Sequence, residues 1–292
     1  MKYIVVTGGA GFIGSNLINS LTAYDKKLKI ISIDNYFTGI KKNHIKNKNV
    51  KYLRGDTRNI SQILSKYKKH IKVIFHFAEF SRIAQSFDNL GKCFNSNIIG
   101  SYEVIQFCLK NKIKIIYSAT SASLGNAGKD QNLSPYAFSK SNNMNLIMNL
   151  HEWFGLKFEI IYFYNVYGPK QIYNSSMAAV LGVFESNYRQ KKPLPVVKPG
   201  SQTRKFTHVK DTVDACIYAW KKNKNKHYSI SNKRSYSILE LAKLFSNNIK
   251  IIPERRGERF KSSEVKKIRN YKIINLIGKT SLNNYIKEIK NI

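Results

Sequence analysis

Two residues four positions apart, Tyr136 and Lys140, have side chains suited to moving a proton on and off a hydroxyl group. They lie in a segment with helical periodicity, where positions i and i+4 share one face, so both side chains point the same way. A free phenol has a pKa of about 10, and a nearby ammonium group favours the phenolate, the form that acts as a general base. The spacing Tyr-x-x-x-Lys also arises by chance, so it gains meaning only beside a cofactor site.

A glycine loop near the N-terminus predicts such a site. The run Thr7-Gly8-Gly9-Ala10-Gly11-Phe12-Ile13-Gly14 follows a predicted strand and opens a predicted helix. Glycines allow the tight turn, let the backbone approach a pyrophosphate and let helix and strand pack closely. The helix start offers free N–H groups and the positive end of its dipole to phosphate. We assign dinucleotide binding to Gly8, Gly11, Phe12, Ile13 and Gly14.

Asp34 lies at the end of the second predicted strand, about 20 residues beyond Gly14. A carboxylate there accepts hydrogen bonds from the adenosine ribose hydroxyls and repels a 2′-phosphate, which predicts NAD in preference to NADP. Asp56, at the end of the third predicted strand, is a candidate for the adenine edge. The alternative at both positions is an acid that only caps a loop or helix.

The elements that must position these residues follow from the hydrophobic pattern. Short β-branched runs alternate with longer helical patterns, which predicts βαβ units with strands buried on both faces. We expect an α/β fold, a doubly wound parallel Rossmann-type sheet of six or seven strands with a smaller C-terminal substrate-binding α/β region. The predicted strands are 3–7, 30–33, 50–53, 73–77, 113–117 and 158–163, and the predicted helices are 12–23, 60–67, 92–110 and 136–154.

The regular alternation ends near Asn165, after which Pro and Gly residues punctuate the chain. We expect residues 1–165 to form an NAD-binding domain to which residues 206–231 return. Residues 166–205 and 232–292 are expected to form a cap that binds the substrate.

Composition excludes several classes of protein. Hydrophobic residues make up 42% of the 292 residues, which argues against wholesale disorder. No apolar stretch approaches the roughly 20 residues that span a bilayer, and no secretory signal is recognisable, so we expect a cytoplasmic protein without membrane association. The cysteines, Cys93, Cys108 and Cys216, show no metal-ligand spacing and are expected to be reduced thiols in the core; no metal site is predicted.

The charge is unusual, because 50 Lys and Arg residues against 17 Asp and Glu residues give a formal net charge of +33. Such an excess occurs in nucleic-acid-binding proteins, where cations neutralise phosphates and release counterions. Here the lysines are scattered along the whole chain among Asn and Ile residues, which favours solvated basic faces. We expect no nucleic-acid partner, although a surface of this sign attracts acidic ligands such as a nucleotide sugar.

The sequence resembles the extended short-chain dehydrogenase/reductase family nearly end to end, especially its nucleotide-sugar epimerases and dehydratases. The matching motifs are the Thr-Gly-Gly-x-Gly-Phe-Ile-Gly loop, Asp34-Asn35, Gly55-Asp56, His76-Phe77-Ala78, Asn97-x-x-Gly100, the segment 117–125, Tyr136-x-x-x-Lys140 and Asn165-Val166-Tyr167-Gly168-Pro169. This resemblance implies NAD as cofactor and a nucleotide sugar as substrate. The motifs are more specific for the superfamily than for the substrate.

The resemblance also implies roles for individual residues. Thr120 would bond the reacting sugar oxygen beside Tyr136, Lys140 would also hold the nicotinamide ribose, and Asn97 would serve the scaffold. Implied cofactor contacts are Asn35, Asp56, Thr57, Phe77, Ala78, Glu79 and Phe163, and implied substrate contacts are Ser81, Arg82, Thr120, Asn165, Val196, Arg204 and Arg255, or Arg256 in its place. Arginine suits phosphate because its planar fork makes bidentate hydrogen bonds.

Departures from the family pattern narrow the reaction. Dehydratases of the family carry an Asp-Glu pair just after the catalytic Ser/Thr, where this chain has Ser121 and Ala122, which argues against elimination of water. Glu79 replaces a residue that is usually small and brings a carboxylate near the cofactor. A serine at 262 or 263, where the family limits the sugar's 2-substituent, would admit N-acetylated sugars.

The leading hypothesis is a nucleotide-sugar 4-epimerase for UDP-glucose and UDP-galactose or their N-acetyl forms. It would work through a 4-keto intermediate with transient hydride transfer to tightly bound NAD, as a homodimer paired through the helices at 92–110 and 136–154. A heptose 6-epimerase or another keto-intermediate enzyme is an alternative, because the segment Ser176-Met177-Ala178-Ala179-Val180 resembles that branch. The charge suggests a further alternative, a non-catalytic dinucleotide-sensing or polyanion-binding protein, against which the intact Thr120, Tyr136 and Lys140 argue.

Overall fold

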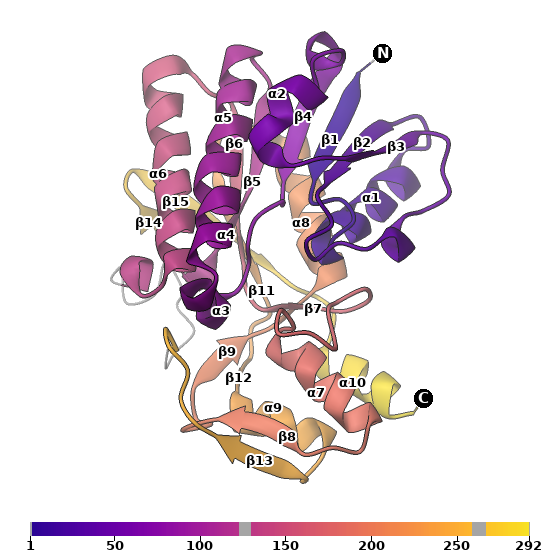
Figure 1. Ribbon diagram of the computed structural model, residues 1–292, viewed down its shortest axis with the longest axis vertical. Coiled ribbons are helices and arrows are strands. Elements are labelled where there is room, and N and C mark those ends of the chain that lie inside the picture. The colour runs from indigo at the N-terminus through magenta and orange to yellow at the C-terminus, as the bar shows by residue number, and fades with distance from the viewer. Residues whose placement is uncertain (1, 123–129, 259–266, 292) are drawn as a thin grey trace.

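The innermost strands of the central sheet are rich in buried Ile, Val and Phe residues, and helices cover both faces of that sheet. The computed structural model describes residues 2–122, 130–258 and 267–291. Figure 1 shows this sheet in the upper part of the molecule and a smaller α/β region below it. In order across the sheet, the strands are β14 (Lys267–Ile268), β15 (Tyr271–Ile277), β11 (His227–Ser231), β6 (Phe158–Phe163), β5 (Lys114–Thr120), β4 (Ile71–His76), β1 (Tyr3–Thr7), β2 (Lys29–Asp34) and β3 (Val50–Arg54).

The sheet is doubly wound, as the sequence predicts. All of its neighbouring strands run parallel except β14, which is antiparallel to β15. From β1 the chain adds β2 and β3 on one side and β4, β5 and β6 on the other, so the strand order reverses between β1 and β4. In open α/β sheets, ligands bind outside the carboxyl ends of the strands at this reversal.

Helices cover the two faces of the sheet and bury separate hydrophobic clusters. On one face lie α2 (Ile60–Ile63), α5 (Ser101–Lys110) and α6 (Pro135–Phe154), which pack against Val5 and Ile115. On the other face lie α1 (Phe12–Tyr24) and α8 (Val209–Lys222), which pack against Val6 and Phe75. Further helical segments are η1 (Lys41–Asn43), η2 (Thr57–Asn59), η3 (Lys68–His70), α3 (Ile83–Asp88), α4 (Leu90–Phe94) and the π-helical turn η4 (Asn95–Gly100).

The smaller region has its own core, in which Phe184, Phe206 and Phe245 are fully or almost fully buried. It contains α7 (Val180–Arg189), α9 (Ile238–Phe245), α10 (Leu282–Lys290) and three two-stranded sheets. These sheets pair β7 (Val166–Tyr167) with β10 (Thr207–His208), β9 (Thr203–Lys205) with β12 (Ser235–Ser237), and β8 (Leu194–Val197) with β13 (Ile249–Ile252).

The structure corrects several predicted elements. The main sheet has nine strands where six or seven were expected, and β15 pairs with β11 in this sheet although residues 232–292 were assigned to the cap. In β15 only Ile273 is buried, so the strand lacks the apolar run that marks a central one. The helix predicted at 60–67 ends at Ile63, and the one predicted at 92–110 is divided among α4, η4 and α5.

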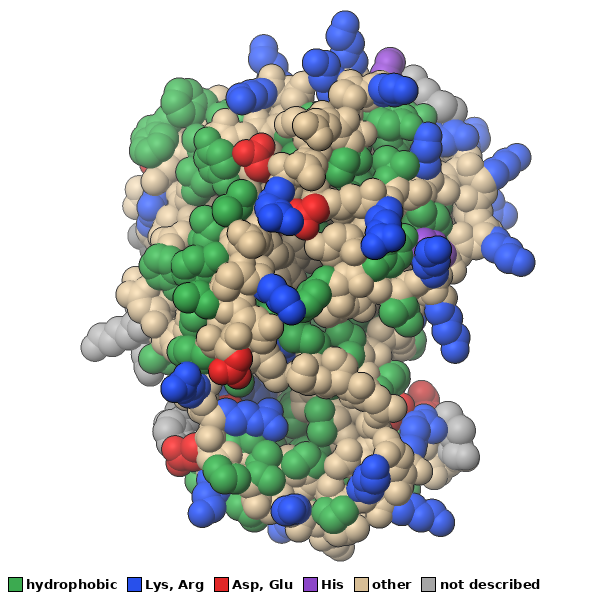
Figure 2. Space-filling view, viewed as in Figure 1, with side chains coloured by type: hydrophobic (Ala, Val, Ile, Leu, Met, Phe, Trp, Pro, Cys, Tyr) green, Lys and Arg blue, Asp and Glu red, His purple; other side chains and the backbone are tan. Residues whose placement is uncertain are grey.

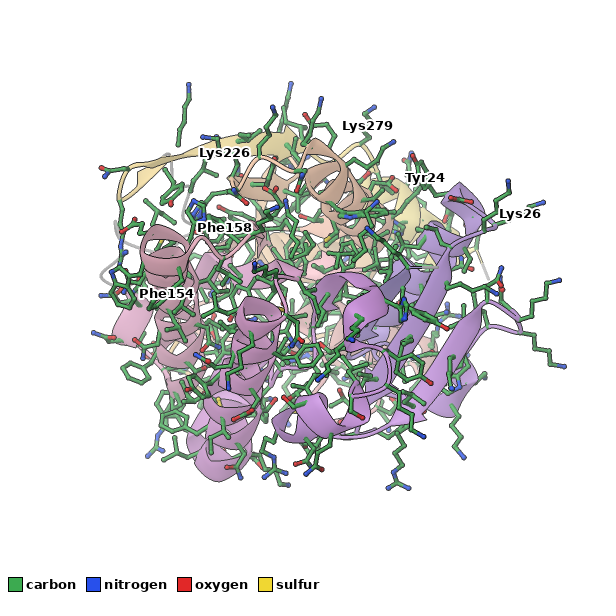
Figure 3. All side chains as sticks on the ribbon, turned by 90° about the horizontal axis from the view of Figure 1, so that it is seen from above. Tyr24, Lys26, Phe154, Phe158, Lys226 and Lys279 are labelled. Atoms are coloured by element: carbon green, nitrogen blue, oxygen red, sulfur yellow. The ribbon has the colours of Figure 1, made fainter. Side chains whose placement is uncertain are left out.

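The positive charge is dispersed over the surface. Figure 2 shows Lys and Arg side chains spread over the visible face without forming one patch. In Figure 3, Lys26, Lys226 and Lys279, all exposed, lie at separate places around the rim of the molecule. Within residues 2–122, 130–258 and 267–291, no helix is both long and apolar enough to cross a membrane. Cys93, Cys108 and Cys216 are buried free thiols, as predicted.

A buried ion pair closes the amino ends of β5 and β6. The carboxylate of Glu159 is fully buried and accepts hydrogen bonds from Lys114 Nζ at 2.5 Å and from the backbone N–H groups of Lys224, Asn225 and Lys226 at 2.7, 3.1 and 2.9 Å. Burial lowers the pKa of Lys114, which the nearby carboxylate opposes. The pair therefore ties the turn after α8 to the sheet.

Replacing Glu159 should strongly destabilise the fold. We expect Glu159→Ala to lower the free energy of unfolding by about 3–5 kcal/mol, because it leaves three backbone donors without this acceptor and the buried Lys114 ammonium without its counter-charge, with Asn223 Oδ1 as its remaining acceptor. Urea denaturation at pH 7 measures the change. Glu152→Ala on the exposed side of α6 is the control and should change stability by less than about 0.5 kcal/mol. Equal stability of the two variants would show that the pair is not structural.

Candidate functional site

A cavity of about 600 Å³ opens at the carboxyl ends of the central strands and reaches into the smaller region. Figure 2 shows the surface hollowed between the upper and lower parts of the molecule. Among the predicted site residues, those that line the cavity are Gly8, Gly11, Phe12, Ile13, Gly14, Asp34, Asn35, Asp56, Thr57, Phe77, Ala78, Glu79, Ser81, Arg82, Thr120, Tyr136, Lys140, Phe163, Asn165, Arg204 and Arg255. The volume is in the range of binding pockets for organic ligands.

The glycine loop leaves the start of α1 open toward this cavity. Gly11 is the N-cap of α1 and provides no side-chain cap, so the first N–H groups of the helix are free to bind an anion. Gly8 has a φ of +72°, and a Cβ there would lie 2.9 Å from the backbone of Phe77. At Gly14 a Cβ would lie 2.2 Å from the carbonyl oxygen of Gly8. The loop can therefore hold this shape only with glycine at these positions, and it fits a pyrophosphate.

The carboxylate of Asp34 is almost buried at the end of β2. It accepts hydrogen bonds from the backbone N–H of Ala10 at 2.9 Å and of Tyr36 at 2.8 Å, which ties it to the glycine loop. Burial raises the pKa of Asp34, and these backbone donors oppose the rise. Asp34 thus has a structural role in the loop as well as a place in the cavity lining.

Asn35 and Asp56 meet across neighbouring strand ends. Asn35 Nδ2 donates to Asp56 Oδ2 at 3.1 Å, and Asp56 Oδ1 accepts from the backbone N–H of Arg58 at 3.0 Å, which caps η2. The capping role considered for Asp56 in the sequence is therefore present, together with its position on the cavity wall.

The three predicted catalytic residues lie at the ends of β5 and α6. Thr120 is the last residue of β5 and is 8% exposed. Tyr136 stands in the first turn of α6, where Ser134 caps the helix by accepting from Ala137 N at 3.1 Å. Lys140 follows one turn later, and both it and Tyr136 are buried at the cavity wall. A hydroxyl, a phenol and an ammonium thus share one wall, which is suited to acid–base chemistry on a bound alcohol.

Glu79 is in contact with Lys140, and the side chain of Glu79 is only 3% exposed. Its Oε2 forms an ion pair with Lys140 Nζ. Its Oε1 accepts from Ser101 Oγ at 2.9 Å, from Tyr117 Oη at 2.9 Å and from Asn143 Nδ2 at 3.1 Å. The carboxylate was predicted to lie near the cofactor, and the structure adds that its charged partner is Lys140.

A chain of hydrogen bonds joins this carboxylate to the glycine loop through His76. Thr7 Oγ1 accepts from the backbone N–H of Phe77 at 3.2 Å and so donates to His76 Nδ1 at 2.7 Å. His76 Nε2 then carries the proton and donates to Ser101 Oγ at 2.9 Å, which in turn donates to Glu79. Burial lowers the pKa of His76 to about 4, which fits the neutral ring that this pattern requires.

Asn97 stabilises the cavity wall from the π-helical turn η4. Its side chain accepts from Phe80 N at 2.6 Å and donates to Phe80 O at 3.0 Å and to Ser139 Oγ at 3.1 Å. The backbone carbonyl of Asn97 accepts from Asn143 Nδ2 at 2.5 Å. These contacts are those of the scaffold residue that the resemblance implies.

Arginines also line the cavity. Arg204 is 7% exposed and pairs with Glu258. Arg82 donates from Nε to the carbonyl oxygen of Met177 at 2.6 Å, which joins the start of α3 to the segment 175–178. Asn165 Nδ2 donates to the carbonyl oxygen of Lys205 at 2.9 Å. A phosphate or sugar in this part of the cavity would meet cationic and amide groups held in place by backbone contacts.

One predicted site residue lies elsewhere. Val196 is fully buried in the core of the smaller region, while its neighbours Pro195 and Val197 line the cavity. Alternation along β8 explains the difference, because successive side chains of a strand point to opposite faces. Ser262 and Ser263, the positions predicted to set the space for a 2-substituent, lie outside the described residues.

Sequence patterns missed the residues that surround Glu79. Ser101, Tyr117 and Asn143 come from α5, β5 and α6 and have no fixed spacing from it along the chain. The sequence indicated them only indirectly. Glu79 stands where the family usually has a small residue, and a carboxylate that is buried there requires hydrogen-bond partners.

A family model described as the NAD dependent epimerase/dehydratase family matches residues 4–231. Among curated proteins, UDP-glucuronic acid decarboxylase 4 of Arabidopsis thaliana is 27% identical over 263 residues, which cover 84% of this chain but 57% of that protein. A putative UDP-glucose 4-epimerase of Methanocaldococcus jannaschii is 27% identical over 277 residues, which cover 91% of this chain and 88% of that protein. The chain thus spans a little over half of the length of the first relative.

Solved structures agree with the observed fold. A UDP-glucose 4-epimerase of Thermotoga maritima, solved with UDP-glucose, superposes with a TM-score of 0.84 at 25% identity, covering 98% of this chain and 96% of that one. A UDP-N-acetylglucosamine 4-epimerase of Methanobrevibacter ruminantium, in complex with UDP-N-acetylmuramic acid, gives a TM-score of 0.82 at 25% identity, covering 99% and 96%.

The position of Asp34 predicts the choice between dinucleotides. We expect Asp34→Asn to reduce the preference for NAD over NADP about tenfold, because a carboxylate repels a 2′-phosphate and an amide does not. Dissociation constants of the two dinucleotides, measured by calorimetry, give the ratio. Asp214→Asn on the exposed face of α8 is the matched control. An unchanged ratio in Asp34→Asn would mean that another group excludes the phosphate.

Proposed function

Because the chain belongs to the NAD-dependent epimerase/dehydratase family, we propose that it is a nucleotide-sugar 4-epimerase acting on UDP-glucose and UDP-galactose or on their N-acetyl forms. The observation that carries the proposal is the wall formed by Thr120, Tyr136 and Lys140 at the cavity, without the acidic pair of the family's dehydratases. The likeness to solved 4-epimerases over nearly the whole chain supports the same choice.

Each residue of the wall has a chemical task in this proposal. NAD in the open end of the glycine loop supplies a hydride acceptor that can return the hydride. Tyr136 takes the proton of the sugar 4-hydroxyl and gives it back after the 4-keto sugar has turned, while Thr120 aligns the reacting oxygen. Lys140 donates a hydrogen bond to the cofactor ribose. Arg204 and Arg255 lie where they would bind the diphosphate.

The residues after Thr120 argue against dehydration. Ser121 is 5% exposed, and Ala122 packs in an apolar cluster with Phe80, Tyr136 and Met177. An acid and a base for the elimination of water are absent at these two positions. The catalysis available from this part of the cavity is therefore oxidation and reduction at one carbon, which is sufficient for epimerisation.

A 6-epimerase of heptose sugars is the second candidate. It is supported by the segment 176–180, in which Met177 packs in the cluster of Tyr136 and its carbonyl oxygen accepts a hydrogen bond from Arg82. The carbon whose hydrogen exchanges during turnover distinguishes the two reactions.

A homodimer is part of the same proposal. Large apolar side chains are exposed on the α4, η4, α5 and α6 elements, namely Leu90, Ile99, Tyr102, Phe138, Trp153 and Phe154. Pairing of these helices with a second copy would cover this surface.

Removing the phenol hydroxyl should abolish turnover. We expect Tyr136→Phe to lower kcat by about 10²–10⁴-fold with NAD binding retained, because proton transfer by a positioned acid–base group contributes about that much. The rate is measured with UDP-galactose and the bound NAD by extraction. Tyr24→Phe, at a residue that is 54% exposed, is the control. Near-normal epimerisation by Tyr136→Phe would refute the assignment.

The substrate is best identified by product analysis. We expect purified protein, incubated with a panel of UDP-sugars, to interconvert epimers at C4, with conversion of UDP-N-acetylgalactosamine as well as UDP-galactose. NMR spectra of the products identify the inverted carbon. Inversion at C6 of a heptose substrate alone would favour the second candidate, and strict rejection of the acetylated sugar would contradict the serine at 262 or 263 as the determinant of pocket size.

A further inference from the structure

The carboxylate of Glu79 takes no part in the reaction proposed above, yet it lies against the ammonium group of Lys140. It is held there by three further donors, from Ser101, Tyr117 and Asn143. A carboxylate that accepts this many hydrogen bonds is fixed in position. Its effect on the site therefore passes through Lys140.

Glu79 determines which donors of Lys140 are available. An ammonium group has three N–H donors. Lys140 Nζ gives one to Glu79 and one to the carbonyl oxygen of Ser118, and its next protein acceptor, Ser118 Oγ, lies at the long distance of 3.4 Å. One donor thus remains for the hydroxyl of a ribose placed at the cavity wall.

Glu79 also cancels the charge of Lys140. The ion pair places a carboxylate directly against the ammonium, so at the distance of a neighbouring ligand the two charges largely offset each other. In a buried site of low dielectric, an ammonium without a counter-charge would strongly disfavour a second cation nearby. The oxidised nicotinamide ring is cationic, and the reduced ring is neutral.

We propose that Glu79 is a positioning residue that holds the Lys140 ammonium against Ser118 and neutralises it, so that the site favours the oxidised dinucleotide over the reduced one. The inference rests on the dinucleotide site of the proposed function. It deepens that function, because an epimerase that keeps its cofactor needs it oxidised whenever a sugar arrives. The effect of Glu79 is on binding of the cofactor in its two redox states and does not require the sugar.

Competition between NAD and NADH tests the proposal without any sugar. Purified protein is equilibrated with mixtures of the two dinucleotides, separated by filtration, and the bound fractions are quantified by chromatography. We expect Glu79→Gln to lower the ratio of NAD affinity to NADH affinity at least tenfold, because one uncompensated charge has about this effect at a separation of about 12 Å and an effective dielectric constant of about 20, and a larger effect at shorter range. Because both dinucleotides compete for the same folded molecules, partial unfolding does not change the ratio.

Matched variants separate charge from structure. Glu159→Gln removes the other buried carboxylate that pairs with a lysine, at the opposite ends of the strands, and should leave the ratio unchanged. The double variant Glu79→Gln/Lys140→Met carries neither charge and should return the ratio to within about twofold of the parent protein. Lys140→Met alone leaves the Glu79 carboxylate without its counter-charge and should raise the ratio of NAD affinity to NADH affinity. This variant tests the proposal if Glu79→Gln does not fold.

Three results would overturn the proposal: a ratio within twofold of the parent in Glu79→Gln, an equal fall in Glu159→Gln, or a fall in Lys140→Met. Epimerase activity is assayed separately in the parent protein. If the parent protein does not epimerise at C4 but the ratio changes tenfold in Glu79→Gln, the proposed reaction is rejected and the role of Glu79 is kept. If the parent protein epimerises at C4 but the ratio does not change, the proposed reaction is kept and the role of Glu79 is rejected.

Discussion

The buried ammonium of Lys140 is the constraint on which the arrangement of the cavity depends. A charge that is 95% removed from water requires acceptors and a counter-charge, since its desolvation costs several kcal/mol. Those partners come from separate elements, with Glu79 after β4 and Ser118 on β5. Glu79 in turn requires donors, which α5, β5 and α6 supply. Satisfying one lysine thus fixes the spacing of two strands and two helices at the carboxyl edge of the sheet.

A chain of hydrogen bonds connects Lys140 and Glu79 to the glycine loop. Thr7, the last residue of β1, binds His76 at the end of β4, and His76 reaches Glu79 through Ser101. Because strands β1 and β4 flank the point where the strand order reverses, the chain of hydrogen bonds spans the place where a dinucleotide would lie. The open N-terminus of α1 and the ammonium of Lys140 are therefore linked by one network of hydrogen bonds. A displacement of either group would disturb hydrogen bonds that help to position the other.

What the sequence predicted and what it missed have a common physical reason. The glycine loop, Asp34 and the pair Tyr136 and Lys140 were predictable because their chemistry depends on local spacing along one turn, strand end or helix face. The partners of Glu79 were not, because they converge from elements far apart in the chain. Val196 was wrong by one residue, which in a strand reverses the face. β15 was missed because most of its side chains are exposed, so it shows no buried apolar run.

Among the residues that the structure describes, two buried acid–lysine pairs lie at opposite ends of the central strands and serve different purposes. Glu159 and Lys114 lie at the amino ends of β5 and β6, and the four donors to Glu159 are all fixed parts of the protein. Glu79 and Lys140 lie at the carboxyl end, where the third donor of Lys140 has only the long contact to Ser118 Oγ at 3.4 Å. In a chain of net charge +33, carboxylates are few, and the field of the surface is screened within about 10 Å by salt. A nearby carboxylate is therefore the effective means of neutralising a buried lysine. At the amino ends of the strands such a pair contributes stability alone, whereas at the carboxyl ends it also sets the charge of the site that would bind the cationic cofactor.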